Sequence, residues 1–236
     1  MFIDLHTHAL FGVDDGASDS SVSFDMLESA HKQGVYKVIL SPHCILRDEE
    51  SIDEFIAKRQ EQYDILLNES VLLNKKIPEL CLGAEVYLDN DISKFEGVER
   101  LCIQGTNIML IELPEGKISR RFVEWIYNLT LLDIQPLLAH IERYRISKEV
   151  FAELIDLDVN YQINANIFNS LKGRRNLKKI LKTTRWLCVA SDMHNNNNRC
   201  CNLLDSYKIA SVKFPQIAED LFKNNPKKLF KDYSKV

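Results

Sequence analysis

The first sixteen residues contain five side chains of the types that bind metal ions, and four of them follow Asp4. In DLHTHALFGVDDG, residues 4–16, His6 and His8 stand two positions apart, and Asp14 and Asp15 follow. Side chains two positions apart on a strand lie on the same face, so an H-x-H pair can present two imidazoles to one ion. Imidazoles and carboxylates are typical ligands of divalent metals. The start of the chain therefore predicts part of a metal site.

Residues of the same types recur along the chain, close to the ends of short apolar runs. They are His43 in SPH, Glu85 in GAE, Glu112 in IELP, His140 in AHIERY, and Asp192 and His194 in SDMHN. Taken singly, a histidine in such a place is most often a hydrogen-bonded loop residue. The number of these residues and their common position favour a shared site. Asp4 falls on the face of His6 and His8, and we expect it to be a structural carboxylate near the metal ligands.

Seven short runs of apolar and β-branched residues predict strands. They are Phe2–His6, Val35–Ser41, Leu80–Leu88, Asn107–Leu113, Ile134–His140, Val159–Asn166 and Trp186–Ser191. Amphipathic patterns between the runs predict helices. Ser51–Glu54 has the pattern of a capping box that opens a long helix. The last helical pattern, Arg199–Phe230, is broken by Pro215 and Pro226.

The alternation of strands with helices predicts an α/β fold with a parallel sheet and right-handed crossovers. Seven such units favour a closed or nearly closed barrel, built as one domain over residues 1–236. A doubly wound open sheet would normally place a glycine-rich phosphate loop after the first strand, where this chain has HTHALFGVDDG. In a parallel barrel, the loops that follow the strands meet at one rim. The ligand-type residues are therefore expected to converge there.

The size of the predicted ligand set indicates more than one metal ion. Five histidines and at least four carboxylates, Asp15, Glu85, Glu112 and Asp192, exceed what one tetrahedral zinc binds. The set suits two or three divalent ions such as Mn, Fe or Zn. With three ions, four carboxylates and one bridging hydroxide, the site would keep a net charge of about +1. Such a site attracts an anionic substrate.

The composition argues against several other classes of protein. The net charge is −4, which argues against nucleic-acid binding, and we interpret the basic stretches Lys172–Arg175 and Lys227–Lys228 as solvated faces. The N-terminal residues lack the basic region of a signal peptide, and no apolar run approaches the ~20 residues of a membrane helix. Six cysteines without a C-x-x-C pair are expected to be free thiols. We therefore expect a cytoplasmic protein that is not embedded in a membrane.

The motifs HTH, VDDG, SPH, GAE, IEL, AHIERY and SDMHN occur in an order and spacing that resembles the polymerase-and-histidinol-phosphatase (PHP) superfamily. The resemblance is most specific to the manganese-dependent protein-tyrosine phosphatases of bacterial capsular and exopolysaccharide biosynthesis clusters, and it runs from Phe2 to Phe230. It implies a distorted (β/α)7 TIM-like barrel, the PHP fold, that binds two or three Mn2+ ions, with Fe, Zn or Mg as alternatives. The metal ligands that it implies are His6, His8, Asp15, His43, Glu85, Glu112, His140, Asp192 and His194.

The resemblance also implies roles for residues around the metals. Arg143 in HIER and Arg199 after DMH match catalytic positions that bind the substrate phosphate, a task that suits the bidentate fork of arginine. Our hypothesis is that a hydroxide bridging two metals attacks phosphorus, with His43 or Asp14 as the acid for the leaving group. The implied partner is the phosphorylated tyrosine-rich tail of a bacterial tyrosine autokinase that regulates polysaccharide synthesis. The oligomeric state stays open. The loop CILRDEE departs from the family pattern, and Arg47 within it is a candidate substitute for a missing basic residue.

Other mechanisms can be compared with the same residues. A cysteine-dependent phosphatase needs C-x5-R, and no cysteine of this chain has arginine six positions later. A small-molecule phosphomonoesterase such as a histidinol-phosphate phosphatase would use the same metals and stays an alternative. A metal-dependent amidohydrolase would place a lysine and a histidine where Glu112 and Asn164–Asn166 stand. A non-catalytic regulator is disfavoured because no expected ligand is missing.

Overall fold

The computed structural model describes residues 1–184 and 186–232. Its strands are β1 Phe2–Thr7, β2 Val35–Leu40, β3 His43–Ile45, β4 Glu79–Leu82, β5 Glu85–Tyr87, β6 Ile108–Glu112, β7 Gln135–Leu138, β8 Asn160–Asn164 and β9 Leu187–Ala190. Its α-helices are α1 Ser20–Lys32, α2 Glu50–Leu72, α3 Arg120–Thr130, α4 Lys148–Asp156, α5 Leu171–Ile180, α6 Leu203–Lys213 and α7 Asn225–Asp232. Shorter turns are η1 Ile92–Lys94, η2 Val98–Leu101, η3 Ile141–Arg143, η4 Ala165–Asn169 and the π-helical η5 Asp220–Asn224. Among these described helices, none combines the length and apolar character needed to cross a membrane.

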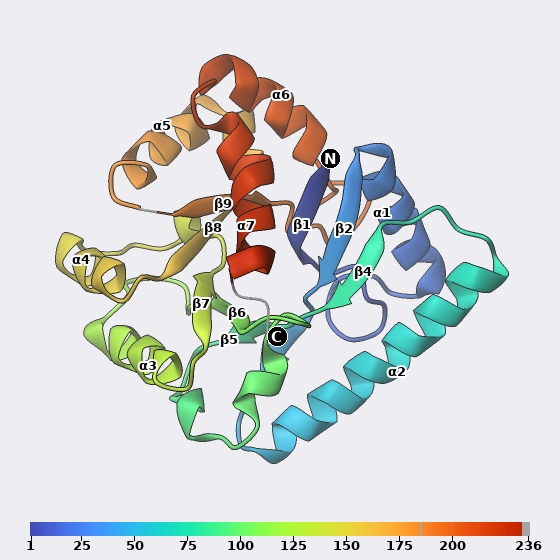
Figure 1. The fold of residues 1–236 in the computed structure, drawn as a ribbon, viewed down its shortest axis with the longest axis horizontal. Coiled ribbons are helices and arrows are strands. Elements are labelled where there is room, and N and C mark those ends of the chain that lie inside the picture. The colour runs from blue at the N-terminus through green and yellow to red at the C-terminus, as the bar shows by residue number, and fades with distance from the viewer. Residues whose placement is uncertain (185, 233–236) are drawn as a thin grey trace.

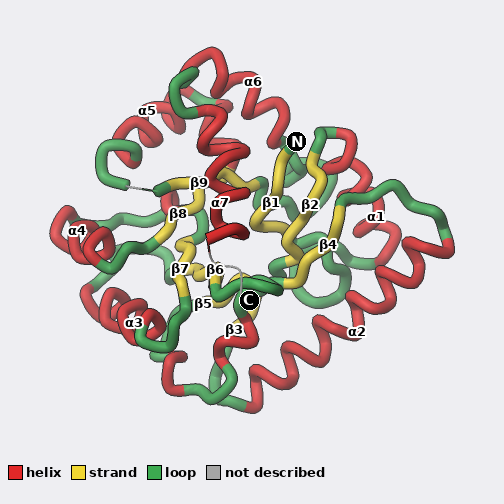
Figure 2. Tube along the Cα trace, in the orientation of Figure 1, coloured by secondary structure: helices red, strands yellow, loops and turns green. Residues whose placement is uncertain are grey.

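The strands form a parallel ring that the helices surround (Figure 1, Figure 2). One sheet has the order β1-β2-β4 and the other the order β3-β5-β6-β7-β8-β9, with every ladder parallel. β9 meets β1 through two backbone hydrogen bonds, from His8 N to Met193 O at 2.9 Å and from Asp192 N to His6 O at 3.0 Å. The predicted α/β barrel-like architecture is confirmed.

The third predicted strand is divided in two, and the second is followed by a short strand that was not predicted, β3. Pro42 lies between β2 and β3, and proline has no N–H to donate to a ladder. Gly83 lies between β4 and β5, where a Cβ atom would come within 2.8 Å of Ile39 Cγ2. Pairing continues across both breaks, because Gly83 N donates to Leu40 O at 2.8 Å and Glu85 N donates to Pro42 O at 3.0 Å. These breaks distort the ring beside the ligand-type residues.

Apolar side chains fill the inside of the ring, and α7 covers one end of it. Ile3 and Leu5 belong to a buried cluster that Leu229 of α7 joins. Tyr36 and Trp186, at the starts of β2 and β9, pack against the same cluster. Helix α7 contacts β1 and β9 and passes across the strands in Figure 1. Since α7 covers the amino-terminal ends of the strands, the carboxyl ends are left for a functional site.

Two predicted helix features were wrong. Helix α2 begins at Glu50, so Ser51 lies inside its first turn, and the Asp48 carboxylate accepts a hydrogen bond from Ser51 N at 2.9 Å. Pro226 does not break the helix, because the π-helical η5 runs directly into α7, with Asn225 in the right-handed helical region. The predicted break at Pro215 is confirmed, since α6 ends at Lys213.

Candidate metal centre

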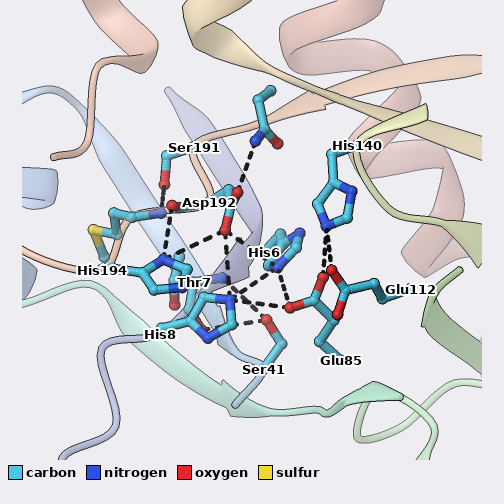
Figure 3. Close-up of polar contacts among 12 residues, drawn as sticks. His6, Thr7, His8, Ser41, Glu85, Glu112, His140, Ser191, Asp192 and His194 are labelled. Carbon is cyan, nitrogen blue, oxygen red and sulfur yellow. Dashed lines mark hydrogen bonds and ion pairs between the residues drawn. The ribbon is translucent and has the colours of Figure 1, made fainter. Parts of the chain in front are cut away.

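Glu85 contacts four of the histidines that meet at the carboxyl ends of the strands, and Figure 3 shows it beside His6 and His140. Its Oε2 is 3.1 Å from His6 Nε2, 3.2 Å from His8 Nε2 and 3.0 Å from His43 Nδ1. Its Oε1 is 2.8 Å from His140 Nε2. Burial alone would raise the pKa of Glu85, but the imidazoles of His6 and His140 hold it well below its ordinary value. Glu85 is therefore an anion shared by four imidazoles.

Asp192 forms a second centre within the same cluster. Its Oδ1 lies 3.6 Å from His6 Nε2, 3.5 Å from His8 Nε2 and 3.4 Å from His194 Nδ1. Burial alone would raise the pKa of this carboxyl, but His6 and His8 lower it below the ordinary value. Asp192 is therefore an ionised, buried carboxylate whose Oδ1 faces three imidazoles.

Three overlapping groups of ligand atoms occur in this cluster, each with all its atoms within 4.8 Å of one another. The groups are His8, Asp15, His43 and His194; His6, His8 and Asp192; and His43, Glu85 and Glu112. His140 lies beside the third group, with its Nε2 3.5 Å from Glu112 Oε1. The structure thus brings together every residue that was predicted to be a metal ligand. Because His8 and His43 each belong to two groups, the groups would hold neighbouring ions.

The chemistry of the donor set fits divalent cations. His6 Nε2 and His8 Nε2 face each other at 3.0 Å, and the buried His194 Nε2 has no hydrogen-bond partner within the described chain. Burial and the neighbouring His8 lower the pKa of His194 to about 4, so its lone pair is free at neutral pH. Burial and the charge of Glu85 raise the pKa of Glu112. A cation between these groups would satisfy the lone pairs and relieve the repulsion of the carboxylates.

Asp14 orients two of the predicted ligands. Its Oδ2 accepts hydrogen bonds from His8 Nδ1 at 2.6 Å and from His43 N at 2.9 Å, while its Oδ1 accepts one from Gly16 N at 2.9 Å. Burial alone would raise the pKa of Asp14, but the hydrogen bonds from His8, Gly16 and His43 together lower it. A Cβ atom on Gly16 would lie 2.0 Å from His8 O, so this turn requires glycine. These contacts favour a positioning role for Asp14 over proton donation.

Two residues of β8 were missed by the sequence analysis. Gln162 Oε1 accepts a hydrogen bond from His140 N at 2.7 Å and lies 3.3 Å from His6 Nδ1. Gln162 Nε2 donates to Asn164 Oδ1 at 2.8 Å, and Asn164 Nδ2 donates to Asp192 Oδ2 at 2.7 Å. The signal was present as two amide side chains at alternate positions of a buried strand. Together they link ligands from three strand ends.

Backbone strain and a tyrosine fix two further ligands. Tyr144 Oη is 3.2 Å from His140 Nδ1 and accepts a hydrogen bond from Leu113 N at 3.0 Å. His140 and Asp192 have left-handed φ angles of 31° and 55°. Such angles cost roughly 1–3 kcal/mol in residues other than glycine and persist where the surroundings hold them in place. The imidazole of His140 and the carboxylate of Asp192 are thus directed by their local backbone.

Arg143 and Arg199 both contact Asp192 while remaining accessible. Arg143 Nη2 donates to Asp192 Oδ2, and Arg199 Nη2 lies 3.0 Å from Oδ1 and 3.1 Å from Oδ2. Each arginine side chain is 38% exposed, so N–H groups remain for an anion from solvent. Asn195 Oδ1 accepts hydrogen bonds from Asn197 N and Arg199 N, so the asparagine run forms the turn that holds Arg199.

A hollow of about 520 Å3 opens beside the cluster. Its polar lining consists of three carboxylates and one imidazole, from Asp14, Asp15, Glu112 and His43. Its less polar lining consists of Val13, Ile45 and Tyr87. The side chain of Asp15 is 66% exposed at this mouth. Arg47 is exposed before α2 and is not one of these lining residues, so the geometry does not support it as a substitute phosphate ligand.

Asp4 lies apart from the metal-ligand groups. The register of β1 shifts between Asp4 and Thr7, so Asp4 does not continue the face of His6 and His8. Its Oδ1 accepts a hydrogen bond from Ser191 N at 2.9 Å, next to Asp192. Burial raises the pKa of Asp4 to about 6. The structure therefore gives Asp4 the structural position that was expected, although not through the predicted face.

Comparisons of sequence give one consistent family. The model of the family described as capsular polysaccharide synthesis, CpsB/CapC, matches residues 2–231. The tyrosine-protein phosphatase CpsB of Streptococcus pneumoniae is 30% identical over 246 residues, which cover 98% of this chain and 98% of the relative. The tyrosine-protein phosphatase YwqE of Bacillus subtilis is 29% identical over 227 residues, which cover 90% of this chain and 85% of the relative.

Comparisons of structure support the same fold. One matching chain comes from the crystal structures of YwqE from Bacillus subtilis and CpsB from Streptococcus pneumoniae, which are described as unique metal-dependent tyrosine phosphatases. It matches with a TM-score of 0.81 and 22% sequence identity, over 99% of this chain and 96% of that chain. The phosphotriesterase homology protein of Escherichia coli, complexed with phosphate in its active site, matches with a TM-score of 0.54 and 13% identity over 97% of this chain and 98% of that one. At these identities, the likeness shows the fold of the chain.

Proposed function

The chain belongs to the CpsB/CapC family of capsular polysaccharide synthesis, and from this premise we propose that it is a metal-dependent protein-tyrosine phosphatase. It is then a phosphoric monoester hydrolase that releases phosphate from phosphotyrosine. The observation that carries the proposal is one rim where three groups of metal-ligand atoms meet two accessible arginines. Cations and arginines together suit a phosphate dianion.

The nine clustered side chains would hold two or three Mn2+ ions, with Fe, Zn or Mg as alternatives. The ligand groups overlap at His8 and His43, so each of these histidines would hold one ion and lie beside a neighbouring one; His8 would use Nε2, because its Nδ1 is bonded to Asp14. When bound, such ions supply a hydroxide at neutral pH and offset the charge of the phosphoryl oxygens. The mixture of imidazoles and carboxylates favours Mn, Fe or Zn over ions that prefer oxygen ligands alone.

Residues of this chain would bind and orient the substrate around that centre. Arg143 and Arg199 would exchange part of their contact with Asp192 for the phosphate oxygens, since both guanidinium groups reach solvent. In the hollow beside the metals, the phenyl ring of the substrate phosphotyrosine would pack against the aromatic ring of Tyr87. His43 lines the same hollow; it would bind a metal through one ring nitrogen and give the proton on the other to the phenolate oxygen that leaves. A phenol, with a pKa of about 10, needs less help than an alcohol.

We further propose the partner and location that the family resemblance implied. The substrate would be the phosphorylated tyrosine-rich tail of a bacterial tyrosine autokinase, in a system that makes capsular or exopolysaccharide. A cytoplasmic location is supported by the six cysteines, each of which is a free thiol. A single domain is supported by the family match over residues 2–231 and by the pairing of β1 with both β2 and β9.

The proposal can be tested by measuring phosphate release on metal-stripped protein with and without Mn2+. A phosphotyrosyl peptide and histidinol phosphate would be compared in parallel at the same concentrations. We expect Mn-dependent turnover that favours the peptide. Preference for histidinol phosphate would move the protein to the small-molecule phosphatases, and no turnover of either compound would refute a phosphatase at this site.

A further inference from the structure

A second hollow, of about 720 Å3, lies at the same end of the barrel. It is formed between η3, η4 and α5, the helix next to β8 and β9 in Figure 1. Three basic side chains line it, Lys172, Arg175 and Lys179 of α5, together with Asn166 and Glu142. The basic stretch that the sequence suggested to be a solvated face therefore borders a cavity.

The three cations of this hollow have no ionic partner within the described residues. Lys172, Arg175 and Lys179 are exposed, and none of them forms an ion pair there. The acid in the lining, Glu142, accepts a hydrogen bond at its Oε1 from Asn164 N at 3.0 Å, and its carboxylate is turned toward β8. The hollow is thus a local positive site in a chain of net charge −4.

Two residues of the second hollow are close in the chain to residues that contact Asp192. Glu142 directly precedes Arg143, which contacts Asp192. Asn166 follows Asn164 by two positions, and Asn164 also donates to Asp192. A peptide whose phosphotyrosine is held by Arg143 can therefore pass directly over this basic surface.

An apolar extension continues from the basic hollow. A smaller cavity of about 320 Å3 also contains Glu142 and Lys179 in its lining, and it adds Ile146, Phe151 and Ile180. Charged and apolar surfaces thus lie side by side. This combination suits a side chain with an aromatic ring and a phosphate at its tip.

We propose that the hollow lined by Lys172, Arg175 and Lys179 is an accessory subsite for a second phosphotyrosine of the same peptide. The proposal rests on the proposed tyrosine-phosphatase function and adds a preference for multiply phosphorylated substrates. A phosphate dianion matches the three unpaired cations better than a single carboxylate does. The aromatic ring of the second residue would rest on the apolar extension, while the first phosphotyrosine lies at the metal centre.

The test compares kcat/KM for three peptides and for p-nitrophenyl phosphate, all with Mn2+. One peptide carries a single phosphotyrosine, one carries two, and one has glutamate in place of the second; the spacing is varied from one to four residues. We expect the wild-type protein to favour a doubly phosphorylated peptide about tenfold over the single one. R175Q/K179Q should remove this preference and leave turnover of p-nitrophenyl phosphate within about twofold.

The matched control is K178Q, since Lys178 is exposed on the same helix and lines neither cavity. It should keep the wild-type preference. The subsite is refuted if wild type shows no preference, if R175Q/K179Q keeps it, or if K178Q loses it equally. A glutamate peptide that equals the doubly phosphorylated one would overturn the phosphate assignment. Failure of wild type to cleave any phosphotyrosyl peptide would instead refute the proposed function itself.

Discussion

At the scale of single residues, Asp192 connects the two halves of the candidate site. One carboxylate faces His6, His8 and His194 and also contacts the guanidinium groups of Arg143 and Arg199. It would therefore hold a metal ion and the two arginines that are proposed to bind phosphate in a fixed relation. Losing its charge should affect the metals and the substrate together.

Asp192→Asn keeps the shape of the side chain but removes this charge. We expect kcat/KM for p-nitrophenyl phosphate to fall by about 100-fold or more, with less metal bound. Activity assays and elemental analysis of the same sample would measure both effects. Asp205→Asn is the control, because Asp205 is an exposed carboxylate paired with Lys208 on α6. Full activity in Asp192→Asn would contradict its assignment as a ligand.

Asp14 allows positioning to be separated from proton transfer. Because Asp14 accepts hydrogen bonds from His8 and His43, Asp14→Asn should raise the Mn2+ concentration needed for half-maximal activity by about 10–100-fold. Saturating Mn2+ should then restore most of kcat. A loss of kcat that no Mn2+ concentration restores would show instead that Asp14 is the acid.

At the scale of elements, the strands were predictable and their interruptions were not. Apolar runs located every strand of the ring except the short β3, and the rule that parallel strands end at one rim located His43, Glu85 and His140. The breaks at Pro42 and Gly83 depend on contacts between neighbouring strands, which a local pattern does not contain. Gln162 and Asn164 were missed for the same reason. Their amides find partners only after the ring has brought distant ligands together.

Helix α7 should contribute to stability without contributing to catalysis. Leu229 is buried in the cluster that fills the amino-terminal end of the ring. Leu229→Ala should lower the free energy of unfolding by about 2–5 kcal/mol, because it leaves a cavity. Urea denaturation would measure the loss, with Val212→Ala as control, since Val212 is 73% exposed on α6. Turnover per folded molecule should stay unchanged, and a selective loss of turnover would contradict this separation of the two ends.

At the scale of the whole molecule, metal binding and folding should be coupled. Glu85, Glu112 and Asp192 gather negative charge at one buried rim, and cations would relieve their repulsion. Any ligand that binds only the folded state raises its stability. The distant segments that close the ring, β1 and β9, meet where these ligands stand. Metal loading should therefore be measurable as stability of the whole chain.

We expect Mn2+ at about 100 times its dissociation constant to raise the melting temperature of metal-stripped protein by about 5–10 °C. Glu85→Gln should lose most of this shift because it alters the carboxylate shared by four imidazoles. Glu79→Gln should keep the shift, since Glu79 is exposed and paired with Lys37. Thermal unfolding followed by circular dichroism would measure all three. Equal increases in melting temperature in the three proteins would show that Mn2+ binds at a site that does not include Glu85.

The most direct single measurement is the number of Mn2+ ions bound per chain, determined together with phosphotyrosyl-peptide turnover as metal-stripped protein is titrated. The account predicts that two or three ions bind and that turnover appears only as the second ion is bound, because the ligand groups share His8 and His43. Full turnover with one ion or none per chain would contradict a shared multi-metal centre at this rim.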